Sequence, residues 1–356
     1  MLTIKDYLRL EDELLNEKII HAKKQLGSKL SILGHHYQKD EIIEFCDEIG
    51  DSLQLAQIAQ KNRTAAYIVF CGVHFMAETA DMLTSNSQKV LLPNKKAGCS
   101  MADMADLEQL EICWEQLVET FGDDFFPITY VNSTAEVKAF VGRHNGFTVT
   151  SGNADELVQK AIETGKRILF LPDQHLGRNT VMKLGIEERE IALYNPLTKE
   201  ILSNEIEEDI RVVLWDGHCC VHQKFTPDMI HSLREEHDDI QVIVHPECPE
   251  EIVNLSDASG STNKILSVIN ASAEGSKWAV GTDNNMVSRL IKEQTNREVI
   301  SLNPKAPPCR FMNLITKGHL AYTLESLVEG RVINEIKVRE EIKQDALLAI
   351  ERMLAI

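Results

Sequence analysis

Short apolar runs alternate with amphipathic stretches through most of the chain, and this alternation predicts an α/β protein. Before about residue 28, and again from about residue 315 to the end, apolar residues instead recur with a helical period. Between these helical ends, strand-like runs lead into polar clusters and then into acidic helix starts. Strands joined through helices run parallel, so we expect parallel sheets covered by helices.

Three strand-like runs of similar character indicate an internal repeat of roughly a hundred residues. The runs begin at Ser31, Phe126 and Gln241, and two further strand-and-helix units follow each of them. In the first repeat we take the run from Tyr67 as the second of these units. The repeat therefore predicts three similar α/β units between the helical ends.

The repeat also predicts the domain boundaries. We expect a first α/β domain with an N-terminal helix at residues 1–115, a second at 116–215 and a third at 216–315. C-terminal helices at 316–356 are expected to pack back on the first domain. In parallel sheets, ligands bind at the carboxyl ends of strands and at helix N-termini. His, Tyr, Asn, Ser, Thr and Cys residues collect at these ends in all three units, which favours a binding site there.

The acidic composition narrows the classes of partner. Lysine and arginine number 37 against 55 aspartates and glutamates, for a formal net charge of -18. Such a surface repels phosphate backbones and anionic lipid, so we expect neither nucleic acid nor a membrane as a partner. The first twenty residues are charged throughout, and no run approaches ~20 apolar residues, so we expect no signal peptide, no membrane span and a cytoplasmic location.

The eight cysteines are not expected to form disulfides in a reducing compartment. Three of them follow strand-like runs close to glycine or proline: Cys99, Cys219 and Cys309. Loops of this kind expose sulfur and leave backbone N–H groups available, which suits thiolate ligands of iron. Taken singly, each is more often a buried structural thiol, and the pattern alone does not choose between Cys219 and Cys220.

The chain resembles the quinolinate synthase family over nearly its whole length. The motifs that carry the resemblance occur in the family's order. They are H-x-Y at His35 and Tyr37, G-D-S at 50–52, His74 with Glu78, AGCSMADM around Cys99, Y-x-N at Tyr130 and Asn132, T-S-x-N-A at 150–154, PDQHLGRN from Pro172, G-x-C-x-V-H ending at His222, HPEC from His245, D-x-x-G-S-T ending at Thr262, and Cys309 followed by Met312. The motif that ends at His222 places the second cysteine ligand at Cys219.

The chain departs from the family pattern at a few places. Gly34 replaces the usual alanine before the first histidine, and the usual G-T-E is G-T-D, ending at Asp283. Asn303 and Ala306 replace the cysteines of the C-x-x-C-x-x-C motif that some members carry, so a thiol–disulfide switch is not expected. The segment 182–212 is longer than in the shorter members. None of these differences affects a matched ligand.

The resemblance implies three α/β domains in a pseudo-threefold arrangement with an active site at their junction. Cys99, Cys219 and Cys309 would bind a 4Fe–4S cluster whose one open iron acts as a Lewis acid. The family's reaction condenses iminoaspartate with dihydroxyacetone phosphate to quinolinate and releases phosphate and two waters, on the route to NAD. The expected partners are these two small anionic substrates, and the enzyme that supplies iminoaspartate could be another.

This reaction requires several proton transfers, for which the resemblance singles out four residues. Tyr37 and His35 follow the first strand, and Tyr37 is expected to deliver protons on the side of the open iron. His245 and Glu247 are expected to remove protons near the ring-closing carbons. Because residues two apart on an extended strand point the same way, each pair is expected to enter one pocket, with His36 turned away.

Substrate binding is expected from polar residues at the strand ends. These are His35, Ser52, Tyr130, Asn132, Ser151, His245, Glu247 and Thr262. Serine and threonine before helices usually act only as N-caps, and a lone strand-end histidine is more often structural, so these assignments rest on the resemblance. Two other classes stay open: a zinc or iron hydrolase with histidine and aspartate ligands, and a non-catalytic iron–sulfur sensor.

Overall fold

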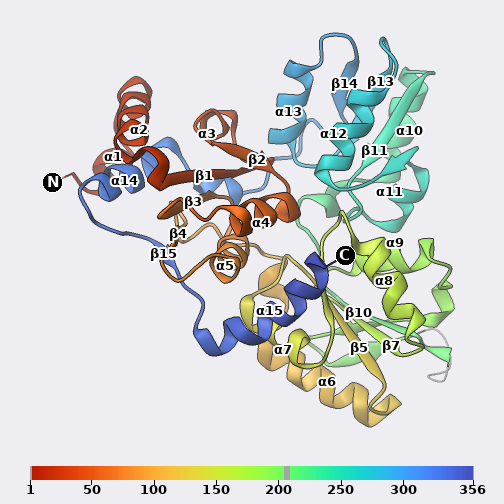
Figure 1. The fold of residues 1–356 in the computed structure, drawn as a ribbon. Coiled ribbons are helices and arrows are strands. Elements are labelled where there is room, and N and C mark those ends of the chain that lie inside the picture. Colours follow the sequence, from red (N-terminus) through yellow and green to blue (C-terminus); the bar gives the residue numbers. More distant parts are fainter. Residues whose placement is uncertain (1, 204–208, 356) are drawn as a thin grey trace. The chain divides into compact units, whose positions relative to one another are not determined.

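The computed structural model describes residues 2–203 and 209–355, and it contains three largely parallel sheets with helices between their strands (Figure 1). The predicted α/β class is therefore confirmed. The chain divides into two compact units. Unit 1 comprises residues 1–99, 283–289 and 307–338, and unit 2 comprises residues 100–282, 290–306 and 339–356. The first sheet belongs to unit 1 and the other two to unit 2, while the three domain boundaries stay a prediction.

The strands form sheets of five, six and four members. The first sheet consists of β1 Leu30–His35, β2 Glu48–Gly50, β3 Tyr67–Cys71, β4 Lys89–Leu91 and β15 Glu335–Ile336. The second consists of β5 Phe125–Tyr130, β6 Phe147–Val149, β7 Arg167–Leu171, β8 Ile191–Asn195, β9 Glu200–Leu202 and β10 Val212–Trp215. The third consists of β11 Ile240–Val244, β12 Ala258–Ser259, β13 Lys277–Gly281 and β14 Glu298–Ser301.

The three sheets share one topology, which confirms the internal repeat. The orders β2-β1-β3-β4, β6-β5-β7-β10 and β12-β11-β13-β14 each place the first strand between the second and the third. All of these neighbours pair in parallel. Antiparallel pairing occurs only where β15 joins β4 and β9 joins β8 among the strands of the described residues. The longer segment 182–212 thus adds β8 and β9 to the second sheet, while its residues 204–208 lie outside the described part.

The alignment of the first repeat is wrong by one strand. The run from Tyr67 is β3, the third strand of its sheet, and the second strand is β2. With three residues, two of them exposed, β2 carries too little hydrophobic pattern to be recognised from the sequence.

Helices connect the strands and cover the sheets. Those of the first repeat and the N-terminus are α1 Ile4–Tyr7, α2 Asp12–Leu26, α3 Asp40–Ile43, α4 Ser52–Lys61, α5 His74–Leu83 and α6 Leu107–Phe121. The next are α7 Ala135–Arg143, α8 Ala154–Glu163, α9 Gln174–Lys183, α10 Pro227–Glu236, α11 Glu250–Leu255 and α12 Thr262–Ala271. The last are α13 Asn284–Glu293, α14 Lys317–Val328 and α15 Glu340–Leu354. Within residues 2–203 and 209–355, none of them has the length and apolar composition needed to cross a membrane.

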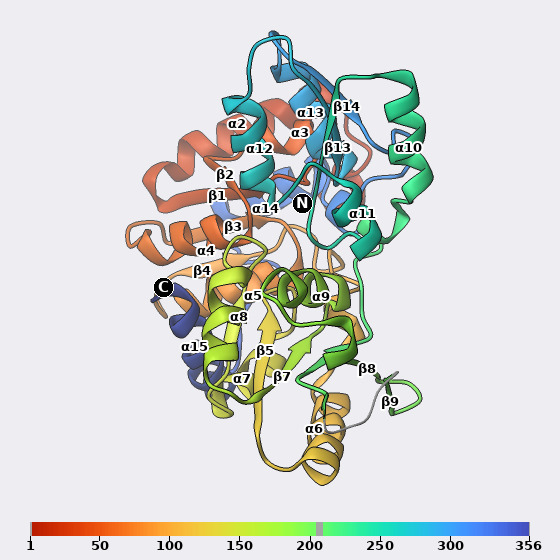
Figure 2. The ribbon, with the colours of Figure 1, turned by 90° about the vertical axis from the view of Figure 1, so that its right-hand side faces the viewer.

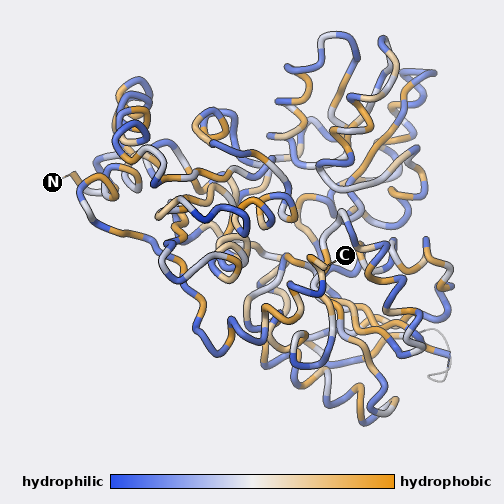
Figure 3. Tube along the Cα trace, viewed as in Figure 1, coloured by the Kyte–Doolittle hydropathy of each residue, from blue (hydrophilic) through white to orange (hydrophobic). Residues whose placement is uncertain are grey.

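The central strands are apolar because helices cover both of their faces. Every residue of β1 is buried, and Val212–Trp215 of β10 are buried along their whole length. Figure 3 shows the hydrophobic colour concentrated on such strands. In the second sheet, β5 and β7 lie side by side with α8 and α9 next to them (Figure 2). The rigid strands hold the loops that leave their carboxyl ends.

The hydrophobic pattern predicted a C-terminal region that is helical throughout, but the structure has an extended segment between two helices. Gly330, with φ 76, ends α14 in the left-handed conformation that favours glycine, and β15 follows as an extended segment. Helix α14 packs on α2 within unit 1, and α15 lies against α7 and β6 within unit 2 (Figure 1). The α7–α15 contact is close, because a Cβ added at Gly142 would lie 1.9 Å from the carbonyl oxygen of Asp345.

Candidate functional site

The residues expected to act as acids and bases, together with Tyr130 and Asn132, lie at or just after the carboxyl end of the first strand of each sheet. In every sheet the first and third strands are neighbours, and the chain leaves them in opposite directions. The carboxyl ends of such a strand pair form the usual ligand-binding edge of an open parallel sheet. We call residues 35–38, 130–133 and 245–248 the first-strand loops.

The three first-strand loops have similar geometry. The backbone N–H of Gln38 donates to the carbonyl of His35 at 2.9 Å, and that of Cys248 donates to the carbonyl of His245 at 3.0 Å. In the second loop the hydroxyl of Ser133 makes the corresponding bond to the carbonyl of Tyr130 at 2.7 Å. The third residue of each loop is therefore structurally equivalent: Tyr37, Asn132 and Glu247.

Both loop histidines have their orientation set by the backbone. Nδ1 of His35 accepts from the N–H of Tyr37 at 3.2 Å, and Nδ1 of His245 accepts from the N–H of Glu247 at 3.3 Å. A neutral ring that accepts at Nδ1 carries its proton on Nε2, so each ring is a donor at Nε2. The rings of His35 and Tyr37 meet edge to face with centroids 4.8 Å apart.

Glu247 is the centre of a buried hydrogen-bond network in unit 2. The hydroxyl of Tyr130 donates to Oε1 of Glu247 at 2.6 Å, and Nδ1 of His222 lies 2.7 Å from Oε2. Nε2 of His222 lies 3.0 Å from the hydroxyl of Thr282. The ring of His245 stacks on that of His222 at 4.6 Å between centroids. Glu247 and His245 are each 3% exposed and His222 is fully buried, so the network is shielded from solvent.

This network separates the protonation states of Glu247 and His245. Burial lowers the pKa of His245 to about 3, and the neighbouring His222 lowers it as well, so the ring is neutral at pH 7. Burial by itself raises the pKa of Glu247. Its two histidine neighbours and the hydrogen bonds from His222 and Tyr130 outweigh burial and hold that pKa below the usual 4.5. Unit 2 thus holds a buried carboxylate base beside a neutral imidazole.

Cys219, His222 and Glu247 form a possible metal-binding group. One ligand atom from each lies within 4.8 Å of the others. A thiolate, an imidazole and a carboxylate together suit zinc or iron. The sequence left the role of His222 open, and Thr282 was noted only through its neighbour Asp283 in the G-T-D motif.

The three predicted cluster cysteines occupy equivalent loops. Cys99, Cys219 and Cys309 each precede by three residues a short 3-10 helix, at Ala102–Met104, His222–Lys224 and Met312–Leu314. In each case an α-helix begins eight residues after the cysteine, namely α6, α10 or α14. Cys220 is displaced from this position by one residue.

Two of the cysteine loops share a backbone contact. The carbonyl of Cys219 accepts from the N–H of Gln223 at 3.0 Å, and that of Cys309 accepts from the N–H of Asn313 at 3.1 Å. The N–H of Cys309 donates to Oδ2 of Asp283 at 2.6 Å. The three loop cysteines are partly exposed. Cys99 and Cys309 belong to unit 1 and Cys219 to unit 2.

The predicted substrate-binding hydroxyls lie at helix N-termini. Ser52 and Thr262 are the first residues of α4 and α12, and Ser151 lies between β6 and α8. Oγ1 of Thr262 and Oδ1 of Asn132 are buried and have no hydrogen-bond partner among the described residues. Buried polar atoms are rarely left unpaired, so these two are suited to contact a ligand.

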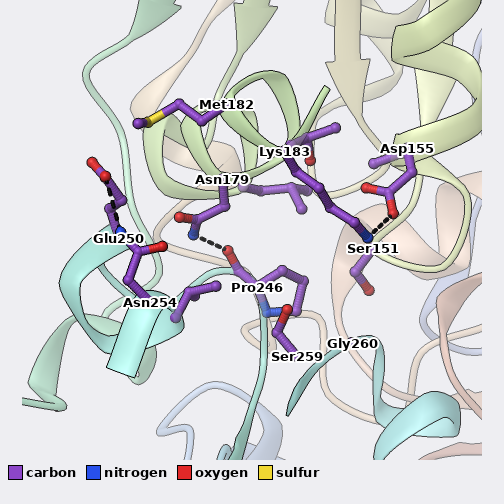
Figure 4. Close-up of a pocket in the computed structure, with 14 residues that line it drawn as sticks. Ser151, Asp155, Asn179, Met182, Lys183, Pro246, Glu250, Asn254, Ser259 and Gly260 are labelled. Carbon is purple, nitrogen blue, oxygen red and sulfur yellow. Dashed lines mark hydrogen bonds and ion pairs between the residues drawn. The ribbon is translucent and has the colours of Figure 1, made fainter. Parts of the chain in front are cut away.

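Ser151 also lines a pocket of unit 2 with a volume of about 410 Å³ (Figure 4). Helices α8, α9 and α11 contribute its walls, and Lys183 pairs with Asp155 at its rim. Asn179 points across it to the carbonyl of Pro246, which lies between His245 and Glu247 in the third first-strand loop. Asn179 ends the PDQHLGRN motif, but the sequence assigned it no role in the site, because its contact with Pro246 joins two distant segments.

Known proteins resemble the chain over almost its whole length. The family model described as "NadA: Quinolinate synthetase A protein" matches residues 17–355. The quinolinate synthase of Bacillus subtilis (strain 168) is 54% identical over 350 residues, 98% of this chain and 95% of that protein. The quinolinate synthase of Anoxybacillus flavithermus (strain DSM 21510 / WK1) is 52% identical over 349 residues, again 98% and 95% of the two chains.

Proposed function

The chain belongs to the quinolinate synthase family and is an enzyme of this type, and we propose that it condenses iminoaspartate with dihydroxyacetone phosphate to quinolinate. The reaction releases phosphate and two waters and serves NAD biosynthesis. Beyond the family relationship, the observation that carries the proposal is the Glu247 network. It places a shielded carboxylate beside a neutral imidazole donor and a tyrosine hydroxyl, so groups that can accept and donate protons lie side by side.

We propose that Cys99, Cys219 and Cys309 bind a 4Fe–4S cluster. Their fit to such a group rests on two features: the thiols are partly exposed, and they occupy equivalent loops. Thiolates are the usual ligands of these clusters. When bound by three cysteines, the cluster has one iron without a protein ligand, which supplies Lewis-acid chemistry for loss of water.

The acid–base work falls to the first-strand loops. The carboxylate of Glu247 removes a proton from a substrate carbon, while Tyr130 and His222 hold its two oxygens in place. Nε2–H of His245 donates to a substrate oxygen or nitrogen. Tyr37 delivers protons from its hydroxyl, and His35 contacts the Tyr37 ring and orients it.

Substrate binding falls to the remaining polar groups. Oδ1 of Asn132 accepts a hydrogen bond from a hydroxyl or amino group of the substrate. The hydroxyls of Thr262, Ser52 and Ser151 bind carboxylate or phosphate oxygens, which the N-termini of α12, α4 and α8 favour electrostatically.

The Cys219–His222–Glu247 group supports a second candidate, a mononuclear metal hydrolase. Anaerobic purification followed by iron, sulfide and zinc analysis separates the two. A 4Fe–4S enzyme has iron and acid-labile sulfide in equal amounts, whereas stoichiometric zinc without sulfide would favour the hydrolase and overturn the cluster.

Single cysteine substitutions test the ligand assignment. Cys99→Ala, Cys219→Ala and Cys309→Ala should each lose most of the iron and all turnover. Cys220→Ala is the matched control and should keep both. Loss of iron in Cys220→Ala together with retention in Cys219→Ala would show that the second ligand is misassigned.

A further inference from the structure

Asn179 holds the third first-strand loop at two points. Its side-chain nitrogen donates to the carbonyl of Pro246 at 2.8 Å and to the carbonyl of Cys248 at 2.9 Å (Figure 4 shows the first bond). These two carbonyls flank Glu247 on either side. A single amide from α9 therefore spans the backbone of the residue that carries the proposed base.

Lys138 does the same for the second loop. Its ammonium donates to the carbonyl of Val131 at 2.8 Å and to the carbonyl of Ser133, the two neighbours of Asn132. Lys138 is fully buried on α7. Removing an ammonium from water is costly unless hydrogen bonds replace the lost hydration, and the two loop carbonyls provide such bonds, so the Lys138 ammonium and the loop are held together.

Arg289 completes the set in unit 1. Its guanidinium donates to the carbonyls of His36 and Gln38, which flank Tyr37, and it also binds Asp40 at 3.0 Å. Asn285 of the same helix, α13, adds a bond of 2.9 Å to the carbonyl of Tyr37 itself.

Two of the three donors come from equivalent places in the fold. Asn179 and Arg289 are each the sixth residue of the helix that follows the third strand, α9 and α13. Each reaches the first-strand loop of another repeat: α9 that of the third repeat, and α13 that of the first. Lys138 instead comes from the helix after its own loop.

We propose that Asn179, Lys138 and Arg289 are positioning residues, which aim Glu247, Asn132 and Tyr37 by binding the carbonyls on both sides of each. The inference rests on the proposed function of these three residues. The carbonyl of the preceding residue fixes the peptide plane on the N-terminal side of the central residue, and the carbonyl of the following residue fixes the plane one unit beyond its C-terminal side. Holding both therefore limits the backbone rotations of the short segment that carries the central Cβ. A catalytic group displaced by about 1 Å can cost about a hundredfold in rate, so such restraint matters for turnover.

Asn179→Leu tests the proposal, because leucine has a similar size and no donor. In the cluster-loaded enzyme we expect kcat to fall by about tenfold or more, with iron and sulfide content unchanged. Amide hydrogen exchange of the segment 245–249 should become at least several-fold faster. Asn254→Leu is the matched control: Asn254 lines the same pocket, but its amide binds the side chain of Glu250 and no loop carbonyl among the described residues, so both readouts should stay as in the parent.

A second variant keeps the test decisive if Asn179→Leu does not fold. Arg289→Lys retains the charge and the pairing with Asp40, but an ammonium lacks the planar fork of the guanidinium. We expect lower kcat and faster exchange of residues 35–38 in this variant. Parent-like kcat and exchange in a folded Asn179→Leu or Arg289→Lys would overturn the proposal. Should the parent make no quinolinate, the proposed function fails, while the exchange measurement still tests the loop restraint on its own.

Discussion

Removing the hydroxyl of Tyr130 tests the Glu247 network most directly. Tyr130→Phe keeps the ring in place and deletes the 2.6 Å hydrogen bond to Oε1 of Glu247. A hydrogen bond to a charged group contributes about 1.5–3 kcal/mol, so we expect the free energy of unfolding to fall by about that amount at neutral pH. The pKa of Glu247 should rise toward its ordinary value, because one of the groups that lower it is gone.

The pH dependence of this loss follows from the sign of the shift. The folded-state pKa of Glu247 lies below the ordinary 4.5, so its ionised form stabilises the fold fully above that pH. The stabilisation is lost as the pH falls from 4.5 toward the folded-state pKa. The difference between parent and Tyr130→Phe should therefore be constant from neutral pH down to about pH 5 and shrink below it.

Urea unfolding under anaerobic conditions, followed by circular dichroism at several pH values, measures both effects. Tyr194→Phe is the control, because Tyr194 is a buried tyrosine of the same sheet that is not part of the Glu247 network. Its unfolding free energy should change by less than that of Tyr130→Phe and without the same pH dependence. A Tyr130→Phe protein within about 0.5 kcal/mol of the parent at pH 7 would refute the charged hydrogen bond.

Two further substitutions test the site and the fold. Tyr37→Phe should reduce turnover by about a hundredfold or more with full cluster content, as loss of a general acid does, while His36→Ala should be much milder. Near-normal turnover of Tyr37→Phe in steady-state assays, or collapse of His36→Ala with the fold intact, would remove Tyr37 from the mechanism. Gly142→Ala places a Cβ 1.9 Å from the carbonyl of Asp345, so α7 and α15 must separate. We expect a loss of about 1–3 kcal/mol in thermal or urea unfolding, and unchanged stability would contradict this packing.

The sequence by itself determined the fold class and the order of its main strands. Strands β1, β5 and β11 are long apolar runs that end in polar residues, so local pattern alone identifies them and their parallel pairing. It also placed candidate residues at the carboxyl ends of these strands. The ligand assignment of Cys219 over Cys220 came from the family motif, since neighbouring cysteines have the same local pattern.

Short elements were beyond the reach of the sequence pattern. The three-residue β2 and the two-residue β15 have too few residues to show a period, and each exists because a neighbouring strand offers hydrogen bonds. The first repeat was misaligned for this reason, and residues 331–339 were predicted as helix although they form β15 and the loops beside it.

Only the tertiary structure decided which side chains meet. Tyr130, His222, Glu247 and Thr282 lie far apart in the chain, and their hydrogen bonds depend on how the loops of two sheets in unit 2 pack. The pKa values of His245 and Glu247 follow from that burial, which no local pattern contains. The carbonyl contacts of Asn179 are of the same kind. The period of the apolar residues indicates which face of a helix or strand is buried. A hydrogen bond between distant segments depends in addition on how those buried faces pack against one another, which the period does not specify.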